Sequence, residues 1–382
     1  MRLRTVLWGG LGIFVLFLAL GAGWLLSLPP TPEAIAAPAI GRQEADATIA
    51  ALGPKRQRPL VAIIGINDAT ETTDYLMPYG ILKRADVADV MTVATQPGPM
   101  TLFPALSVEP DATVAAFDAR HPQGADYVIV PAMSRDDDPA VLEWIRRQSA
   151  KGAIVIGICA GAKVVGASGL LDGKRATTHW YSVGGLRDRH PSIRYVADRR
   201  FVVDQGVATT TGITASMPMM LTLIEAIAGR QKAEAVATEL GLTGWDARHA
   251  SAAFKFTRPF ALTAIRSTLA FWDHEQMGLE LTPGMDEVSL ALVADAWSRT
   301  YRSRAVTVSG TNEAITSRNG IRFLPDQVAA SWPSERRIAS FEHQPPVEAL
   351  DQTLRNIADR YGTGTKDFVA MQLEYPKQGA SQ

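Results

Sequence analysis

From residue 60 to about residue 230, short apolar runs alternate with longer stretches in which apolar positions recur at helical spacing. Short apolar runs bounded by turn residues predict buried strands, and the stretches with helical periodicity predict helices. Strands are predicted at residues 60–66, 89–95, 126–131, 153–158, 201–204 and 206–210, and helices at residues 73–83, 112–119, 138–150, 162–168 and 213–227. Strands that are apolar throughout and alternate with helices predict an α/β fold, in which helices cover both faces of a parallel sheet.

The segment AIVIGICAG, residues 153–161, leads from an apolar strand into a turn of small residues, and a helix is predicted directly after it. Cys159, the only cysteine of the chain, lies in that turn. A strand-to-helix elbow raises a nucleophile above the sheet edge, where the N–H groups of the helix N-terminus favour a thiolate. A free cysteine is also among the most buried residue types, so the motif alone supports a nucleophile and a core thiol equally.

Charge and cysteine content narrow the classes of function. The chain has 38 Lys and Arg residues against 39 Asp and Glu residues, so no basic excess indicates binding to nucleic acid or to an anionic membrane surface. One cysteine excludes an intramolecular disulfide framework, and no group of Cys and His has metal-ligand spacing. We therefore expect no metal, no cofactor and no direct nucleic-acid partner.

An uncharged apolar segment at residues 5–28 predicts a membrane anchor. As a helix its 24 residues would extend about 36 Å, which exceeds the roughly 30 Å hydrocarbon layer of a bilayer. The segment is also longer than the apolar region of a secretory signal, although residues 34–36 leave cleavage open as an alternative. Arg2 and Arg4 precede the segment and the next basic residue is Arg42, so the N-terminus is predicted to be cytoplasmic. We expect a single-pass inner-membrane protein with an extracytoplasmic, periplasmic body.

The rest of the chain divides into four predicted parts: a linker at residues 31–58, the α/β domain at 59–232, a second unit at 245–330 and a helical tail at 331–382. The second unit is interpreted as a partial, degenerate repeat, because one constant shift superposes residues 71–111 on 286–326 without a gap and with six identities in 41 positions. Under this shift the position that matches Cys159 is Glu374, in the tail and without an elbow, so this copy cannot carry the same chemistry. Apolar positions of residues 347–361 share one helical face.

The motifs around the cysteine resemble those of the DJ-1/PfpI superfamily. They read Gly157-Ile-Cys-Ala-Gly161, then Gly-Leu-Leu-Asp-Gly at residues 169–173, then Ala-Thr-Thr-His-Trp at residues 176–180. The resemblance covers residues 60–229 and is nearest to the sensor domains of GlxA/AraC-type regulators and to isonitrile hydratase relatives. It implies a flavodoxin-like, class I glutamine amidotransferase-like fold with a nucleophile elbow, and a homodimer. The helix-turn-helix domain of such regulators has no counterpart in the pattern after Gly229.

The resemblance also implies partners for the cysteine. The family has an acidic residue four positions before a proline on the helix after the first strand, and Asp74 precedes Pro78 by that spacing. A protonated carboxyl there can donate to a thiolate or a sulfinate, and an ionised one can act as a base. On spacing alone, Asp74 is equally well a surface residue. His179, twenty residues after Cys159, is a candidate for orienting substrate or tuning the thiolate, or else a packed structural residue.

The family's oxyanion donors are the amide after the cysteine, here Ala160, and a Gly-Gly turn after the third strand, where this chain has Ala132 and a methionine. Gly161 and Thr178 complete the predicted set of substrate-binding residues. The protease branch of the family has histidine directly after the nucleophile. Because Ala160 stands there, the sequence argues against peptidase activity.

Three functions stay open at this point. The first is a cysteine-dependent hydrolase or hydro-lyase that acts on a small molecule such as an isonitrile or an amide, with Cys159 as nucleophile and Asp74 as acid or base. The second is a non-catalytic module that senses a ligand or the redox state through reversible oxidation of Cys159. The third is a structural or interaction domain with a vestigial elbow. Thiol reactivity separates the third from the others, and turnover that is lost in Cys159→Ser separates enzyme from sensor.

Overall fold

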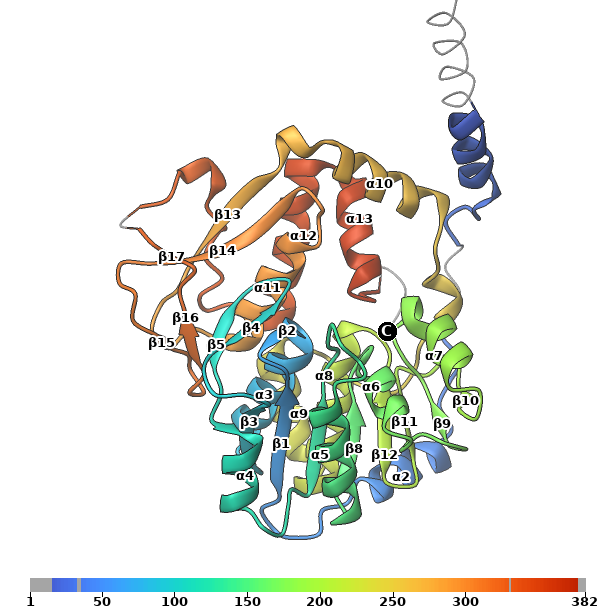
Figure 1. Cartoon of the computed structure of the whole chain (residues 1–382), viewed down its shortest axis with the longest axis vertical. Coiled ribbons are helices and arrows are strands. Elements are labelled where there is room, and N and C mark those ends of the chain that lie inside the picture. The colour runs from blue at the N-terminus through green and yellow to red at the C-terminus, as the bar shows by residue number, and fades with distance from the viewer. Residues whose placement is uncertain (1–15, 33–35, 330, 377–382) are drawn as a thin grey trace, which may run out of the picture.

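The computed structural model describes residues 16–32, 36–329 and 331–376. Its central sheet is built from seven strands: β1 (Leu60–Gly65), β3 (Asp89–Ala94), β6 (Ala112–Thr113), β7 (Tyr127–Val130), β8 (Ile154–Gly157), β11 (Phe201–Asp204) and β12 (Val207–Thr210). They lie in the order β11-β12-β8-β7-β1-β3-β6, and every neighbouring pair is parallel except β11 with β12 (Figure 1). The predicted parallel sheet is confirmed.

Helices cover both faces of this sheet, as predicted. One face packs on α3 (Thr72–Ala85) and α8 (Ser216–Ala228), and the other packs on α4 (Val114–Arg120), α5 (Pro139–Ala150) and α6 (Gly161–Ala167). Successive side chains of a strand point to opposite faces. In β1, Val61 and Ile63 therefore join the α3 side, whereas Ala62 and Ile64 join the α5 side. A strand that is buried on both faces has to be apolar throughout, which is why the apolar runs identified the strands.

A second half of the molecule lies above this sandwich in Figure 1. It contains a parallel sheet of β13 (Glu275–Glu280), β14 (Ser303–Ser309) and β17 (Gln327–Val328), with helices α11 (Glu287–Ser298) and α12 (Pro346–Tyr361). The amphipathic helix predicted at residues 347–361 is α12. Buried side chains of α3, α8, α11 and α12 belong to one apolar cluster, so the two halves share a continuous core.

A small sheet also joins the two halves. It has the order β15-β16-β5-β4-β2, in which β2 (Asp68–Glu71), β4 (Met100–Phe103) and β5 (Ser107–Glu109) come from the first half, and β15 (Ile315–Thr316) and β16 (Arg322–Leu324) from the second. These strands were not predicted from the sequence. They are two to four residues long, which is too short for an alternating pattern to stand out from the surrounding turns.

Several further elements lie outside the predicted pattern: α2 (Arg42–Ala51), α7 (Val183–Arg189), α9 (Arg230–Leu240), α10 (Arg258–Leu269), α13 (Thr363–Gln372), β9 (Arg175–Ala176) and β10 (Arg194–Tyr195). Helix α2 falls within the stretch interpreted as a linker. It is fastened to the domain by an ion pair between Glu44 and Arg199, with 2.6 Å between Oε1 and Nε. The hydroxyl of Tyr127 donates to the carbonyl oxygen of Leu52 directly after the helix, at 2.6 Å.

The predicted membrane anchor requires a correction. Part of the predicted span, residues 5–15, lies outside the described residues, and residues 16–27 form a helix that projects from the body (Figure 1). Within the described ranges, no helix is both long and apolar enough to cross a membrane. This finding contradicts the predicted single-pass inner-membrane location with an extracytoplasmic body.

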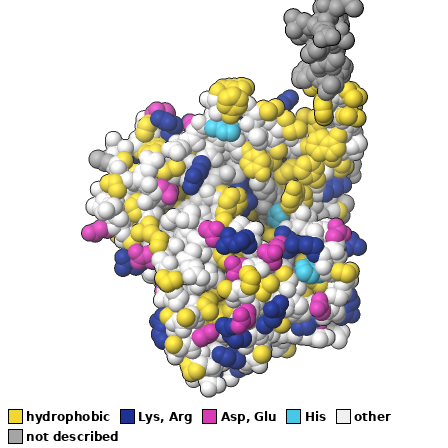
Figure 2. All heavy atoms as spheres, in the orientation of Figure 1, with side chains coloured by type: hydrophobic (Ala, Val, Ile, Leu, Met, Phe, Trp, Pro, Cys, Tyr) yellow, Lys and Arg dark blue, Asp and Glu magenta, His cyan; other side chains and the backbone are white. Residues whose placement is uncertain are grey.

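The base of this N-terminal helix is held by the second half. Arg258 donates through Nη2 to the carbonyl oxygens of Leu26 (2.8 Å) and Leu28 (3.2 Å), which are among the carbonyls that a helix C-terminus leaves unpaired. Figure 2 shows apolar side chains gathered around α10 and the base of this helix, whereas charges of both signs are interspersed over the sandwich below. That mixture on the visible face agrees with the net charge of -1.

Candidate functional site

Cys159 lies in the turn between β8 and α6 and has a φ of 57°, in the left-handed region that residues other than glycine rarely adopt. Two hydroxyl groups hold this backbone. The Cys159 N–H donates to Oγ1 of Thr210 at 2.9 Å, and Oγ1 of Thr178 donates to the Cys159 carbonyl oxygen at 2.9 Å. A strained backbone at the carboxyl end of a central strand is the geometry of a nucleophile elbow.

The small residues of the elbow allow α6 to approach the sheet closely. A Cβ atom on Gly161 would lie 2.0 Å from the carbonyl oxygen of Val130, at the end of β7. A Cβ atom on Gly157 would lie 3.0 Å from the backbone nitrogen of Ala162. A side chain at Gly161 would push the start of α6 away from β7, and one at Gly157 would push it away from β8. Gly161 therefore determines where the helix begins relative to Cys159.

Asp74 lies in the first turn of α3, and its side chain is fully buried. Its backbone N–H donates to Oε2 of Glu71, the residue that caps the helix, at 2.6 Å. Its Oδ2 accepts the N–H of Ala132 at 3.1 Å, and its Oδ1 has no hydrogen-bond partner among the described residues. Burial first, and the negative charge of Glu71 second, raise the pKa of Asp74 well above its ordinary value. These surroundings favour the neutral form of the carboxyl, and Oδ1 is buried without a hydrogen-bond partner among the described residues.

The Cys159 thiol is 5% exposed and lies in the same electrostatic environment. Burial, followed by the charges of Asp74, Glu71 and Glu374, raises the pKa of the thiol, and the N–H of Ala160 lowers it. The thiolate expected at a helix N-terminus is thus not the resting form. Helix α6 has only seven residues, and desolvation outweighs what its terminus contributes. The surroundings thus favour the neutral forms of both the thiol and the Asp74 carboxyl.

The other sequence-predicted residues surround this pair in different ways. Ala160 directs its N–H at the sulfur, whereas the Ala132 N–H, predicted as an oxyanion donor, is taken by Asp74. In His179 both ring nitrogens are engaged: Nε2 lies 3.0 Å from the carbonyl oxygen of Gln372, and Nδ1 accepts the N–H of Tyr181 at 3.2 Å. Burial lowers the pKa of His179, so the ring is neutral and donates from Nε2.

Arg299 was not predicted to belong to this site. This arginine, from the second half, lies 2.6 Å from Oε1 of Glu71 through Nη2 and 2.7 Å from Oδ2 of Asp295 through Nε. Burial is the main cause that raises the pKa of Asp295 to about 7. The Arg299 charge opposes the rise in pKa at Asp74. The one available signal was its identity with Arg84 when the two halves of the sequence are superposed.

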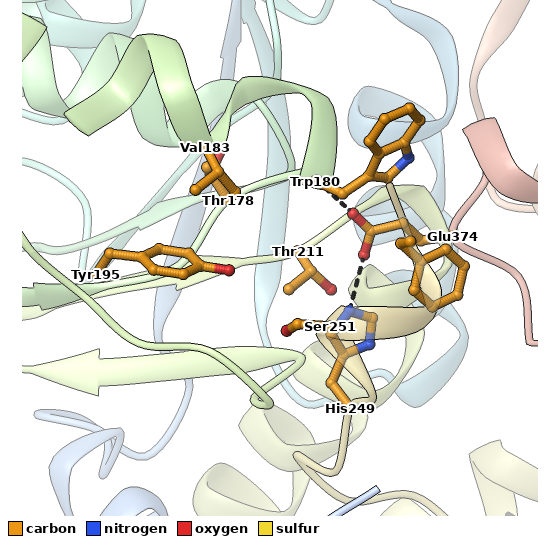
Figure 3. A pocket seen from close by; sticks show the side chains of 9 residues that line it. Thr178, Trp180, Val183, Tyr195, Thr211, His249, Ser251 and Glu374 are labelled. Carbon is orange, nitrogen blue, oxygen red and sulfur yellow. Dashed lines mark hydrogen bonds and ion pairs between the residues drawn. The ribbon is translucent and has the colours of Figure 1, made fainter. Parts of the chain in front are cut away.

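Glu374 was also missed as a site residue. It follows α13, and its buried side chain reaches the loop after β12, where a Cβ atom on Gly212 would lie 2.6 Å from its Cγ. Oε1 accepts the N–H of Trp180 at 2.6 Å, and Oε2 lies 3.4 Å from Nε2 of His249 (Figure 3). A single glutamate in a short C-terminal segment carries no sequence pattern that would indicate this position.

A cavity of about 200 Å³ lies beside the elbow, next to Thr178 (Figure 3). Its lining comes from five parts of the chain: Thr178, Trp180, Val183, Tyr195, Thr211, His249, Ser251, Phe254 and Glu374. Oγ1 of Thr211 is buried without a hydrogen-bond partner in the part of the chain that the structure describes. The volume is below that of pockets for drug-sized ligands, so the cavity suits a small polar molecule. Among the described residues, no group of three or more His, Cys, Asp or Glu could hold a metal ion.

Comparison with known proteins yields matches in the first half of the chain. The DJ-1/PfpI family model matches residues 61–226. Isonitrile hydratase of Pseudomonas putida is 33% identical over 172 residues, which are 44% of this chain and 72% of that enzyme. The HTH-type transcriptional regulator CdhR of Pseudomonas aeruginosa is 36% identical over 104 residues, which are 27% of this chain and 31% of the regulator. The crystal structure of Drosophila melanogaster DJ-1beta has a TM-score of 0.44 and 21% identity, over 49% of this chain and 100% of that chain.

Proposed function

The chain belongs to the DJ-1/PfpI family, and on that premise we propose that Cys159 and Asp74 are the reactive pair of a cysteine-dependent enzyme that hydrates a small neutral molecule. An isonitrile is the substrate class that we favour. The proposal rests mainly on the buried, unpartnered Oδ1 of Asp74 in the same environment as the elbow thiol. The identity with an isonitrile hydratase over 172 residues supports it.

The electrostatics of the pair favour a neutral substrate. The thiol and the carboxyl are both buried, and both have raised pKa values. Ionisation of the two groups at the same time is therefore unfavourable. An isonitrile has no net charge, and its terminal carbon accepts both a nucleophile and a proton. Addition of a thiol to that carbon therefore needs no separated charges in the buried site. A neutral Asp74 can give a proton through one oxygen and take one through the other.

In the proposed reaction the sulfur of Cys159 forms a bond to the terminal carbon of the isonitrile while Asp74 protonates that carbon. The thiol proton replaces the one that Asp74 gives up, so the product is a neutral thioimidate. The Ala160 N–H stabilises negative charge that develops on the sulfur. The oxygen of a water molecule then adds to the thioimidate carbon, and one of the water protons goes to the nitrogen. The carbon–sulfur bond breaks as the remaining hydroxyl proton passes to the sulfur, which releases an N-substituted formamide and restores the thiol.

The cavity next to Thr178 is the proposed place for the rest of the substrate. Its hydroxyl groups, including the unpartnered Oγ1 of Thr211, offer hydrogen bonds to the nitrogen or to the product amide. Glu374 and His249, whose Oε2 and Nε2 atoms lie 3.4 Å apart, line another side of the cavity. Because the cavity measures only about 200 Å³, the substrate has to be small.

The test is hydration of cyclohexyl isonitrile by the purified full chain, with N-cyclohexylformamide measured by mass spectrometry. We expect Cys159→Ser to lower the rate to background and Asp74→Asn to lower it by about 100-fold or more, the usual contribution of a general acid. Asp86→Asn is the matched control, since Asp86 is an exposed aspartate at the end of the same helix. Formamide production that survives in Cys159→Ser contradicts the proposal.

A second candidate is a ligand- or redox-sensing module, which one contact favours. Thr178 holds the carbonyl of Cys159, and the next residue, His179, holds the carbonyl of Gln372 in the C-terminal segment. A change at the cysteine would thus be passed to α13. The raised pKa of the thiol argues against fast oxidation. Stoichiometric gain of two oxygen atoms at Cys159 under mild peroxide, without isonitrile turnover, would favour the sensor over the enzyme.

A further inference from the structure

The elements of the first half recur in the second half at a constant distance along the chain. The pairs β1 and β13, α3 and α11, β4 and β15, β5 and β16, and β6 and β17 all begin with the same offset, at Leu60 and Glu275, Thr72 and Glu287, Met100 and Ile315, Ser107 and Arg322, and Ala112 and Gln327. The pairing of strands recurs with them. Val93 lies opposite Ala112 in the first half, and Val308 lies opposite Gln327 in the second.

An internal hydrogen-bond motif is also repeated. In the first half, Oδ2 of Asp111 accepts the backbone N–H of Thr92 at 2.8 Å and its hydroxyl at 2.9 Å, while the Asp111 N–H donates back to the hydroxyl at 2.9 Å. In the second half, Asp326 and Thr307 make the same three bonds at 2.8, 2.9 and 2.9 Å. The threonine and the aspartate of this motif are two of the six sequence identities. The same hydrogen-bonded connection between a strand and the following turn is therefore present in both halves.

The two halves contact each other reciprocally. Strands β5 and β16 pair in antiparallel fashion with Val108 opposite Phe323, and these two residues occupy the same position in their respective halves. On either side, Glu109 lies opposite Arg322 and Ser107 lies opposite Leu324. Glu109 and Leu324 are equivalent positions of the two halves, and so are Ser107 and Arg322. The residue before the central pair in one strand therefore faces the residue after it in the other strand. Such an exchange is the signature of a two-fold axis between two copies of one surface.

The ion pairs across the interface follow the same exchange. Arg84 of α3 pairs with Asp286, which caps α11, and Arg299 after α11 pairs with Glu71, which caps α3. Arg84 and Arg299 are equivalent positions of the two halves, and so are Glu71 and Asp286. The arginine of each half thus neutralises the helix cap of the other half.

We propose that residues 275–328 are a degenerate copy of the first half-domain that takes the place of a second subunit, and that Arg299 is the positioning residue which this copy supplies to the cysteine site. Arg299 holds Glu71, and Glu71 accepts the backbone N–H of Asp74 at 2.6 Å. The reciprocal arginine, Arg84, contacts the second half, which has no cysteine elbow. Under the same offset, the position equivalent to Cys159 is Glu374 at the end of a helix. On this face, a pairing within the chain replaces the homodimer that the family resemblance implies.

The first experiment asks whether the two halves pair within one chain. Glu109 and Arg322 lie opposite each other, are partly exposed and form an ion pair of 2.9 Å. In a Cys159→Ser background, Glu109→Cys with Arg322→Cys should give an intrachain disulfide and a monomer on a denaturing gel after mild oxidation. A disulfide between two chains, or no disulfide, would overturn the proposal. This experiment needs no substrate, so its result does not depend on the proposed function.

The second experiment tests Arg299, and it rests on the proposed function only in treating the thiol as the reacting group. The readout is the pH dependence of Cys159 alkylation by iodoacetamide in the full chain. Arg299→Gln removes a positive charge beside Glu71 and should shift the profile upward by about half a pH unit or more. Arg299→Lys should restore the wild-type profile, because it keeps the charge.

Arg84→Gln is the matched control, because it breaks the reciprocal ion pair at a similarly buried position and should leave the profile unchanged. An equal shift in both variants, or none in Arg299→Gln, would show that Arg299 is only structural. If Arg299→Gln does not fold, Glu71→Gln gives a second measurement. It removes a negative charge that raises the pKa of the thiol, so the profile should shift downward, and an unchanged profile would overturn the role of Arg299.

Discussion

At Cys159, the backbone and the surroundings act on the thiol in opposite directions. The positive φ and the Ala160 N–H are features of a reactive elbow, whereas burial and three nearby carboxyl groups disfavour the thiolate. The same burial raises the pKa of Asp74. The pair can therefore act by exchanging protons with a neutral substrate, and it is poorly suited to storing a thiolate.

This balance predicts an unusual pH profile for alkylation of Cys159. Because its pKa is raised, the midpoint of the rate with iodoacetamide should lie above about 8.5, the ordinary value for a cysteine. Asp74→Asn should lower the midpoint, because the negative charge of Asp74 is one of the causes that raise the pKa of the thiol. Rates followed by mass spectrometry between pH 6 and 10 check this. A wild-type midpoint below 7 would contradict it.

Asp295 gives a prediction about stability. Its pKa is raised to about 7 in the folded protein, above the ordinary value of 3.8, so the folded state holds its proton more tightly than the unfolded state. The stabilisation is complete below about pH 4 and is lost as the pH rises through 7. Relative to Asp295→Asn, the wild-type protein should therefore lose free energy of unfolding between pH 4.5 and 7.5 in urea titrations. A parallel pH dependence of the two proteins would show that Asp295 is not the group responsible.

At the scale of elements, the position of the cysteine depends on how closely α6 meets β7. Gly161 is the contact point, because its Cα faces the carbonyl oxygen of Val130. Helix α3 contributes in the same way from the other side, since its cap, Glu71, and its first turn, with Asp74, lie at the carboxyl edge of the sheet. The positions of Asp74 and Cys159 therefore depend on where the N-termini of α3 and α6 lie at this edge of the sheet.

Gly161→Ala should therefore be severely destabilising. Its Cβ atom would lie 2.0 Å from a carbonyl oxygen, and we expect a loss of at least about 3 kcal/mol in the free energy of unfolding, since the backbone has to move. Gly184→Ala in α7 is the control: a Cβ atom there meets no atom within 4 Å in the described part of the chain, and it should be neutral or stabilise by up to about 1 kcal/mol. The free energy of unfolding of both variants is measured by urea titration. Similar changes in the two variants would contradict the close contact between α6 and β7 as the cause.

At the scale of the whole molecule, the two halves are joined in three ways: a shared apolar core, the pairing of β5 with β16, and the reciprocal ion pairs. The C-terminal segment then returns to the first half, where Gln372 and Glu374 contact the loops around the cysteine. The site thus uses residues from the first half, the second half and the tail.

The apolar core that the two halves share predicts that they unfold as one cooperative unit. In hydrogen exchange followed by mass spectrometry, peptides that cover β1 and β14 should report the same free energy of opening, because exposing one half exposes the shared core. Arg84→Gln should lower both values together. Protection of β14 that is lost well before that of β1 would contradict a single unit.

The sequence alone determined the parallel sheet, the covering helices and the elbow, because these depend on local patterns. A strand buried on both faces has to be apolar, and Cys159 follows such a strand within a run of small residues. The spacing between Asp74 and Pro78 is also a local sequence pattern, but only the family resemblance indicated that Asp74 is a partner of the cysteine. The short strands β2, β4 and β5 could not be predicted, since their pairing is decided by partners far along the chain.

Only the tertiary structure decided the surroundings of the cysteine. Arg299 meets Glu71 across 228 positions of sequence, and Glu374 meets Trp180 across 194. No local pattern encodes such contacts, because they arise when helix caps and loops from different halves are brought to one sheet edge. Burial, which raises the pKa values of Asp74 and Cys159, is likewise a property of that assembly. The sequence identified the elbow cysteine, and the packing of the second half and the tail determined the surroundings that raise its pKa.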